Sequence, residues 1–258
     1  DGGNTQPELG LEGGHCEHRV LHINGDQTGK GLELFMKKIA TEQKNIRFFE
    51  KTYMREILLE KDSFAGICAI GKEENFSAGS VVVATGGYAG VFEKTTNPKT
   101  TVGSGIAIAA MAGCALDGME FVQFHPTTLR AEVGGNFLVS EAVRGEGGKI
   151  VDESGKSIIN PLDTRDKVSI AIYSEIIKGQ KVFLDATGFE AGFFKERFPS
   201  VYSELKSHGM NPEKDPIPIE TAAHYTIGGV KTDIEARATL KRVYAAGECA
   251  CSGLHGAN

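Results

Sequence analysis

Two histidines lie at the two ends of a middle region whose residue pattern differs from that of both flanks. His125 precedes Pro126, and His224 lies shortly before Gly228 and Gly229. Imidazoles bind carboxylates well through charge-assisted hydrogen bonds. We therefore expect a cleft between two domains, with one imidazole on each wall. The alternative for each histidine is a structural role, with the ring bonds satisfied inside the fold.

A charged run with many small residues covers 140–148 and contains Ser140, Glu141 and Arg144. Glu141 and Arg144 are one helical turn apart, so one interpretation is a simple surface pair worth about a few tenths of a kcal/mol. The other is that Ser140 and Glu141 face a substrate. Arg165 stands at a predicted helix start, where the helix dipole does not favour a cation. Arg165 is therefore predicted to bind an anion or to pair with a carboxylate.

Two apolar, β-branched runs end in glycine. Residues 80–85 lead into Gly86 and Gly87, and residues 242–246 lead into a glycine followed by Glu248. Ligands bind outside the carboxyl ends of parallel strands, and missing side chains let the backbone approach a planar or phosphate-bearing ligand. An acid after such a glycine can accept a hydrogen bond from a ribose or ribityl hydroxyl. The alternative is two ordinary turns at a sheet edge. If both runs bind one ligand, they should be neighbours in one parallel sheet.

The elements that position these residues are predicted from apolar periodicity. Helices are expected at about 30–44, 103–112, 165–178 and 199–208, and strands at 46–49, 53–60, 64–71, 80–85, 120–124, 182–185 and 242–246. The first helix carries an apolar stripe that predicts core packing. The middle of the chain has shorter, mixed elements and lies between the two apolar runs that end in glycine. This pattern indicates one sheet domain interrupted by an inserted domain at roughly 124–224.

Composition narrows the class of protein. The 258 residues are 40% hydrophobic and 24% charged, with a net charge of −6, which is ordinary globular composition without a nucleic-acid-binding face. No apolar run approaches the roughly 18–20 residues of a membrane span. Five cysteines with irregular spacing indicate reduced thiols in a cytoplasmic protein.

The spacing of His15, His18 and His22 leaves open a different class of protein, a non-catalytic metal- or ligand-binding module. Metal ligands, however, usually form tighter sets that include Cys or a carboxylate.

The motifs together resemble the fumarate reductase/succinate dehydrogenase flavoprotein superfamily, in order and over nearly the whole chain. They are Glu12-Gly13-Gly14-His15, Ala84-Thr85-Gly86-Gly87, Thr96-Asn97-Pro98, Gln123-Phe124-His125-Pro126-Thr127, Ser140-Glu141-x-x-Arg144-Gly145-Glu146-Gly147, Arg165-Asp166, His224-Tyr225-x-x-Gly228-Gly229, and Ala246-Gly247-Glu248 through His255-Gly256-Ala257-Asn258. Within the superfamily the chain most resembles the L-aspartate oxidase family. There a glutamate in the position of Glu12 is taken to meet the α-ammonium of aspartate, a charge that distinguishes aspartate from succinate.

The resemblance implies FAD as the cofactor and an α/β fold. A partial Rossmann-like FAD-binding domain, residues 1–123 and 225–258, would carry an inserted α+β capping domain at 124–224. The implied flavin contacts are Ala84, Thr85, Gly86, Gly87, Ser104, Glu248 and Asn258. Ser104 departs from the family pattern, which has an aspartate there. The chain is expected to be an internal fragment, inactive alone and binding FAD weakly or not at all, because the Gly-x-Gly-x-x-Gly turn and a substrate-binding arginine of the family are missing.

The implied reaction is oxidation of L-aspartate to iminoaspartate, the first step toward quinolinate and NAD. Fumarate or O₂ would accept the electrons, so the enzyme would also reduce fumarate, and quinolinate synthase is the expected partner. His125 and His224 would hold the carboxylates, helped by the Ser140 hydroxyl and Glu141, with Glu12 at the ammonium. Arg165 would transfer the proton, without a metal ion. The alternative within the class is the flavoprotein subunit of a fumarate reductase or succinate dehydrogenase.

Overall fold

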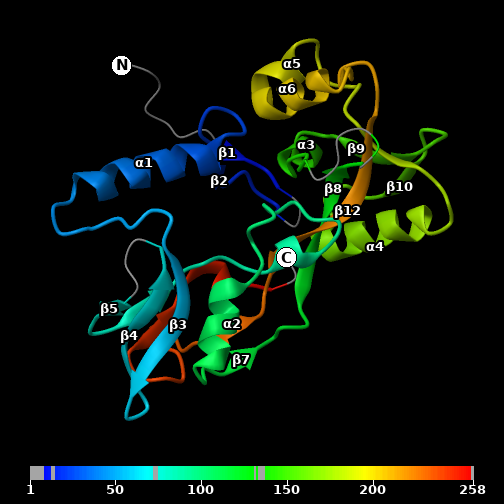
Figure 1. Cartoon of the computed structure of the whole chain (residues 1–258). Helices are drawn as coiled ribbons and strands as arrows, with labels where there is room; N and C mark the ends of the chain where they lie inside the picture. The colour runs from blue at the N-terminus through cyan, green and yellow to red at the C-terminus, as the bar shows by residue number, and fades with distance from the viewer. Residues whose placement is uncertain (1–8, 13–14, 72–74, 131, 133–136, 257–258) are drawn as a thin grey trace. The chain divides into compact units, whose positions relative to one another are not determined.

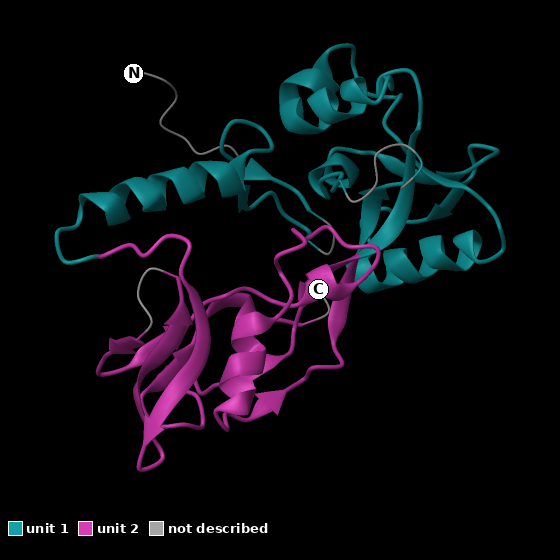
Figure 2. Cartoon of the chain, viewed as in Figure 1, with its two compact units in different colours: residues 1–46, 125–222 teal, residues 47–124, 223–258 magenta. Residues whose placement is uncertain are grey.

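The computed structural model describes residues 9–12, 15–71, 75–130, 132 and 137–256. It divides into two compact units, each made of two chain segments (Figure 2). Unit 1 comprises residues 1–46 and 125–222, and unit 2 comprises residues 47–124 and 223–258. The inserted domain expected at 124–224 has nearly the bounds of the second segment of unit 1, but residues 1–46 group with it and not with 47–124. The assignment of a capping and an FAD-binding domain stays a prediction.

Figure 1 labels most of the helices and strands of the two units. The helices are α1 (Thr28–Glu42), α2 (Ser104–Met111), α3 (Ala142–Gly145), α4 (Arg165–Ile176), α5 (Phe193–Arg197) and α6 (Pro199–Ser207), with short 3-10 turns η1 (Ala89–Val91) and η3 (Gly247–Cys249). The strands are β1 (Leu9–Gly10), β2 (Val20–Leu21), β3 (Tyr53–Glu60), β4 (Ser63–Ile70), β5 (Asn75–Ser77), β6 (Val81–Val83), β7 (Leu116–Asp117), β8 (Val122–Leu129), β9 (Lys149–Asp152), β10 (Ser157–Ile159), β11 (Val182–Asp185), β12 (Ile217–Thr226), β13 (Gly229–Lys231), β14 (Val243–Ala245) and β15 (Ala250–Cys251).

A five-stranded sheet in the order β10-β9-β11-β12-β8 organises unit 1. β11 runs antiparallel to both neighbours, with Phe183 opposite Val151 and Pro218. Helices α4, α5 and α6 contribute apolar side chains to the core against this sheet. Its fully buried members include Ile150, Val168, Ile172, Leu184, Phe194, Leu205, Ile217 and Ile219. Each such side chain contributes about 1.5–3 kcal/mol, so this core supports the starts of α3 and α4, where Glu141 and Arg165 lie.

Unit 2 contains the parallel pair that the sequence predicts. β6 and β14 run parallel, with Val81 opposite Val243 and Val83 opposite Ala245, so the expectation that the two apolar runs are neighbours is confirmed. A continuous apolar β-branched run such as 80–85 is typical of a strand buried on both faces, but Val82 is 60% exposed. Among the described residues, β6 has β14 as its only ladder partner, so its other edge has no strand paired to it.

An antiparallel meander, β3-β4-β5, follows the first helix. β3 has the predicted bounds, 53–60, and Glu60 lies opposite Ser63 across a tight turn. The third strand is not the predicted 46–49, which lies outside any strand, but β5. The meander contributes Ile57 and Phe64 to the core of unit 2.

The first helix forms as predicted, but its apolar stripe does not pack into a core. Leu32 and Met36 are each 56% exposed, and Phe35 is 59% exposed. No residue of α1 is buried by the described part of the chain. The prediction of core packing is therefore wrong for the described part of the chain, in which the apolar side chains of this stripe stay exposed.

Candidate active site

A buried glutamate in unit 1 bridges two arginines. Glu141 is 4% exposed and directly precedes α3, within which Arg144 lies one turn later. Its Oε1 atom accepts a hydrogen bond from Arg144 Nη2 at 2.7 Å, and its Oε2 atom accepts one from Arg165 Nε at 2.6 Å. Arg144 is fully buried, so the surface interpretation of its pair with Glu141 is wrong. The prediction that Arg165 pairs with a carboxylate is confirmed.

Burial and charge act on the Arg144 guanidinium in opposite directions. Burial lowers the Arg144 pKa, the Glu141 carboxylate raises it, Arg165 lowers it and the Glu12 carboxylate raises it. Arg144 also donates through Nη1 to the Pro161 carbonyl oxygen, while its buried Nε finds no hydrogen-bond partner among the described atoms. The positive charge therefore depends mainly on Glu141 for compensation.

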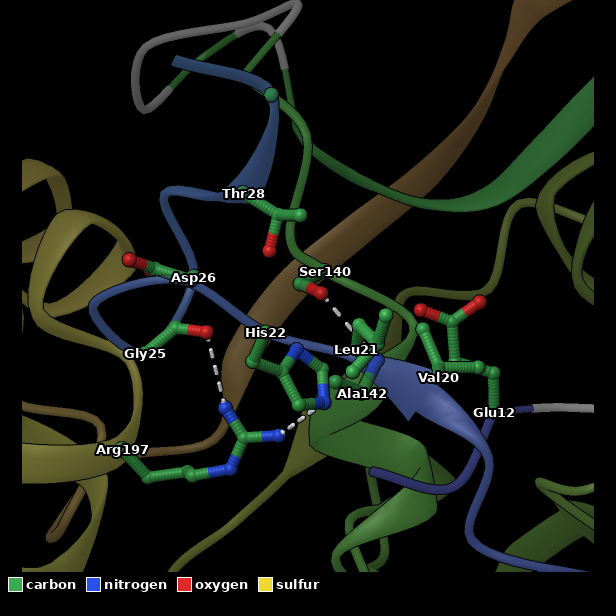
Figure 3. A pocket seen from close by; sticks show the side chains of 11 residues that line it. Glu12, Val20, Leu21, His22, Gly25, Asp26, Thr28, Ser140, Ala142 and Arg197 are labelled. Atoms are coloured by element: carbon green, nitrogen blue, oxygen red, sulfur yellow. Dashed lines mark hydrogen bonds between the residues drawn. The ribbon is translucent and has the colours of Figure 1, made fainter. Parts of the chain in front are cut away.

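Glu12 and Ser140 line one cavity of about 220 Å³ within unit 1 (Figure 3). The Ser140 hydroxyl oxygen accepts the Ala142 N–H at 3.3 Å, at the start of α3. A Cβ on Gly145 would lie 1.9 Å from the Leu11 carbonyl oxygen, so only glycine lets α3 approach the segment before Glu12. The fold thus brings Glu12, Ser140, Glu141 and Arg165 into one region, although their roles stay predictions.

Arg197 borders the same cavity and is not singled out by any sequence pattern. It donates from Nε to Glu146 Oε1 at 3.0 Å and from Nη1 to the Gly25 carbonyl oxygen at 3.2 Å. Its Nη2 lies 2.8 Å from His22 Nε2, the contact drawn as a dashed line in Figure 3. The ring that the sequence offered as a metal ligand is thus bonded to a cation, which is incompatible with metal ligation through the same nitrogen.

Asp26 also joins the first segment of unit 1 to the second. Its carboxylate accepts the N–H groups of Ser200 and Val201 at 3.0–3.2 Å. These donors lie in the first turn of α6, where unpaired N–H groups and the helix dipole favour an anion. The sequence signal for this N-terminus is Pro199 in the first helical position.

His125 lies in β8, is 1% exposed and belongs to unit 1. Its Nδ1 atom accepts the Thr127 backbone N–H at 3.2 Å, with the Thr127 hydroxyl at 3.4 Å. His224 belongs to unit 2, where its Nδ1 atom lies 2.7 Å from the Thr96 hydroxyl. Both imidazoles therefore have a threonine at Nδ1, whatever ligand each ring meets.

Five of the predicted flavin contacts, Ala84, Thr85, Gly86, Gly87 and Glu248, follow the carboxyl ends of β6 and β14 in unit 2. Ala84 and Thr85 are exposed directly after β6. Gly86 and Gly247 both take positive φ, 74° and 75°, and so turn the chain sharply at the same sheet edge. Ser104 is exposed in the first turn of α2. The predicted contact Asn258 lies outside the described residues.

Gly87 is required by internal packing, which the sequence interpretation missed. A Cβ there would lie 2.0 Å from Thr226 Oγ1 and 2.5 Å from Glu248 Oε1. Glu248 Oε1 accepts hydrogen bonds from Thr226 N at 2.8 Å and from Thr226 Oγ1 at 3.1 Å. Burial and the Glu248 carboxylate raise the pKa of the neighbouring Tyr225 phenol. The absent side chain at Gly87 thus makes room for Glu248 as well as for any ligand.

This edge of unit 2 fits the cofactor that the resemblance implies. A Cβ on Gly247 would meet no atom within 4 Å, so the backbone there borders open space. A carboxylate offers about four acceptor positions, and two of the positions of Glu248 are used by Thr226. Glu248 therefore retains acceptor capacity for a ribose or ribityl hydroxyl, as expected beside a flavin nucleotide at the ends of parallel strands.

Within the described ranges, no group of three or more His, Cys, Asp or Glu side chains could hold a metal ion. No helix in the part of the chain that the structure describes is both long and apolar enough to cross a bilayer.

Comparison with curated proteins gives relatives along the whole chain. The L-aspartate oxidase of Pyrococcus horikoshii is 44% identical over 248 residues, covering 96% of this chain and 52% of that protein. The L-aspartate oxidase of Agrobacterium fabrum is 40% identical over 257 residues, covering 97% and 49%. The chain spans about half the length of the curated relatives it matches.

Solved structures give the same fold. A mutant of E. coli quinol fumarate reductase superposes with a TM-score of 0.89 at 32% identity, over 97% of this chain and 48% of that one. Mycobacterium smegmatis Sdh1 in complex with UQ1 has a TM-score of 0.73 at 32% identity, over 98% and 47%. The resemblance to these flavoproteins and to the L-aspartate oxidases is thereby confirmed.

Residues 2–258 match a family model described as FAD binding domain. This match and the superpositions confirm the predicted α/β fold class and FAD as the cofactor. The chain belongs to the FAD-binding domain family.

Proposed function

We propose that the protein containing this chain oxidises L-aspartate to iminoaspartate, in the step that leads toward quinolinate and NAD. The observation that carries the proposal is the place of Glu12. This acid lines the same cavity as Ser140, and its carboxylate raises the pKa of Arg144. An acid in that place suits a substrate with an ammonium group. Relatives at 40–44% identity bear the name L-aspartate oxidase.

The residues of unit 1 would bind the substrate and manage its protons. Glu12 would accept hydrogen bonds from the α-ammonium, and His125 and the Ser140 hydroxyl would donate to carboxylates. Arg165 would stand beside the reacting carbon, with the Glu141 carboxylate orienting its guanidinium through the 2.6 Å bond to Nε. Arginine does not lose its proton in water, so a proton-transfer role requires close positioning, to which the bond with Glu141 would contribute.

The residues of unit 2 would serve the cofactor. When bound, FAD supplies the acceptor for the hydride that leaves the aspartate Cα. Ala84, Thr85, Gly86 and Gly87 would border it along one strand end, and Ser104 and Glu248 would bond its polar groups. His224 would hold a substrate carboxylate.

Electrons would pass on to fumarate or O₂, and quinolinate synthase is the partner that the product suggests. Fumarate as acceptor is favoured by the similarity to a quinol fumarate reductase. We also propose a cytoplasmic location, supported by five cysteines that are all free thiols in the structure.

A second candidate function is that of a fumarate reductase or succinate dehydrogenase flavoprotein. It is supported by the two superpositions at 32% identity. Because succinate has no ammonium, this function gives Glu12 no substrate group to bind. The two functions therefore differ in how strongly a change at Glu12 depends on the substrate.

The test is Glu12→Gln in the intact flavoprotein, with kcat/KM measured for L-aspartate oxidation and for fumarate reduction. Removing one charge-assisted contact worth about 1.5–3 kcal/mol corresponds to a roughly ten- to hundred-fold loss. We expect that loss for aspartate and little change for fumarate.

The matched control is Glu17→Gln, an exposed acid of the same loop. It should leave both reactions unchanged. Equal losses on aspartate and fumarate in the Glu12 variant would contradict the proposal, and succinate oxidation faster than aspartate oxidation in the wild type would favour the second candidate.

A further inference from the structure

The Thr-Asn-Pro motif at residues 96–98 carries no role in the reaction described so far, yet it holds His224. The Thr96 hydroxyl oxygen lies 2.7 Å from His224 Nδ1. The Asn97 side-chain amide donates to the His224 carbonyl oxygen at 2.6 Å. All three residues belong to unit 2, so the contacts lie within one compact unit.

The backbone beside His224 is also hydrogen-bonded to the segment that contains Thr96. Thr96 N donates to the Ala223 carbonyl oxygen at 3.0 Å, and Ala223 N donates to the Lys94 carbonyl oxygen at 2.9 Å. The buried Thr95 hydroxyl donates to the same Ala223 oxygen at 3.1 Å. Residues 94–97 therefore run beside Ala223 and His224 as a bonded pair of segments, which fixes the Cα from which the imidazole projects.

His125 shows what such a contact does to an imidazole. A neutral ring has one donor and one acceptor nitrogen. The Thr127 backbone N–H can only donate, so His125 Nδ1 is the acceptor and the ring hydrogen lies on Nε2. The Thr127 hydroxyl does not alter this, because it donates to the Val139 carbonyl oxygen at 2.8 Å. A ring in this tautomer presents an N–H donor to a carboxylate, which can only accept.

We propose that Thr96 is the positioning residue of His224, donating its hydroxyl hydrogen to Nδ1 and so keeping the neutral ring in the tautomer with hydrogen on Nε2. The arrangement at His224 then matches that at His125, with a side-chain hydroxyl in place of a backbone N–H. This inference rests on the proposed function, in which His224 donates to a substrate carboxylate. On this proposal, a threonine bonded to Nδ1 of each imidazole keeps hydrogen on Nε2, from which the ring donates to the substrate.

The first readout does not depend on activity. In the intact flavoprotein, ¹⁵N chemical shifts of the labelled imidazoles at neutral pH report which ring nitrogen carries hydrogen. We expect His224 to be protonated at Nε2 in the wild type and in Thr96→Ser. Thr96→Val, which removes the hydroxyl at nearly constant volume, should give a mixture of tautomers. Thr96→Ala replaces it if the valine variant does not fold.

The second readout is steady-state kinetics with L-aspartate and fumarate. Losing an oriented donor is worth about 0.5–1.5 kcal/mol, so Thr96→Val should raise KM for both substrates about two- to ten-fold while kcat falls less. Thr96→Ser should restore KM to within about two-fold. The matched control is Thr100→Val, an exposed threonine of the same segment, which should change neither readout.

An unchanged ¹⁵N pattern in Thr96→Val would overturn the proposal, and so would equal losses in the valine and serine variants, since the serine keeps the hydroxyl. His224→Gln separates the two levels of inference. If that variant leaves KM unchanged for both substrates while Thr96→Val still alters the ring, the role of His224 in the proposed function fails and the tautomer assignment stands.

Discussion

Arg165 Nε lies 2.6 Å from Glu141 Oε2, so the first residue of α4 is bonded to a carboxylate that is itself buried against Arg144. One carboxylate thus serves two cations of very different exposure, because Arg144 is fully buried and the Arg165 side chain is 25% exposed. Removing the carboxylate leaves Arg144 buried without its main partner, whereas Arg165 can turn toward water.

Glu141→Gln should therefore destabilise the protein strongly. Breaking a buried pair by removing one partner typically lowers the free energy of unfolding by about 3–5 kcal/mol. The matched control is Glu175→Gln, which breaks another glutamate–cation pair at spacing i,i+3, that of Glu175 with Lys178. That pair is largely exposed, so its loss should be within about 1 kcal/mol. Urea denaturation of both variants checks the prediction, and equal losses would contradict it.

Gly87→Ala should weaken FAD binding by moving Glu248. A Cβ at 2.5 Å from Glu248 Oε1 and 2.0 Å from Thr226 Oγ1 cannot be accommodated without displacing both side chains. We expect an overpacking penalty of about 1–3 kcal/mol and at least a roughly ten-fold rise in the Kd for FAD in the intact protein, measured by flavin fluorescence. Gly79→Ala is the control, because a Cβ there meets no atom within 4 Å. Wild-type affinity in Gly87→Ala would show that Glu248 does not depend on this packing.

The exposed stripe of α1 should drive self-association of the isolated chain. Apolar side chains gathered on one exposed face are an association liability. Phe35→Ser with Met36→Gln should shift the sedimentation profile toward monomer and leave the free energy of unfolding within about 0.5 kcal/mol, because neither side chain is buried. A double glutamine variant at Lys37 and Lys38 on the same helix is the control. The same degree of association in both double variants would refute the prediction.

Stability should fall at alkaline pH through Tyr88. Burial, and secondarily the Glu120 charge, raise the pKa of the Tyr88 phenol above its ordinary value of 10.0, and its hydroxyl donates to the Met119 carbonyl oxygen at 2.5 Å. Because the folded state holds the proton more tightly, this contribution is complete below pH 10.0 and is lost as pH rises through the higher folded-state pKa. Tyr88→Phe should flatten the alkaline fall in unfolding free energy. Tyr53→Phe, at an exposed tyrosine, is the control, and identical slopes in the two variants would contradict the prediction.

Regular periodicity made much of the fold predictable. The bounds of β3 and β11 and the start of α4 follow the sequence patterns, because alternation and a 3.6-residue period are local signals. The sequence patterns did not predict β12. Pro216 and Pro218 lie just before and inside its first residues, and proline lacks the N–H that a strand uses for pairing. The structure accommodates Pro218 by using its carbonyl oxygen, which accepts the Arg130 N–H at 3.1 Å.

The candidate site was predictable in residue type but not in its supporting contacts. Glu141 lies in a charged run and Arg165 stands at a predicted helix start, so both can be recognised from local sequence alone. The partner of His224, by contrast, is 128 residues away at Thr96, and that of His22 is 175 residues away at Arg197. No period or spacing reports such pairs, because they depend on how the core of each unit folds the chain back.

Neither unit is continuous in the chain, and this sets the order in which the protein can form. The bonds from Asp26 to Ser200 span 174 residues, and that from Cys249 to Val83 spans 166. Closing such loops is thermodynamically mild, about 0.6 kcal/mol per doubling of length, but contacts this distant slow folding. During synthesis β6 is made long before β14. The edge of β6 that pairs with β14 therefore stays unpaired while residues 125–222, the second segment of unit 1, are being made. The interval before Val243 appears is when the chain is most exposed to aggregation and has most to gain from a chaperone.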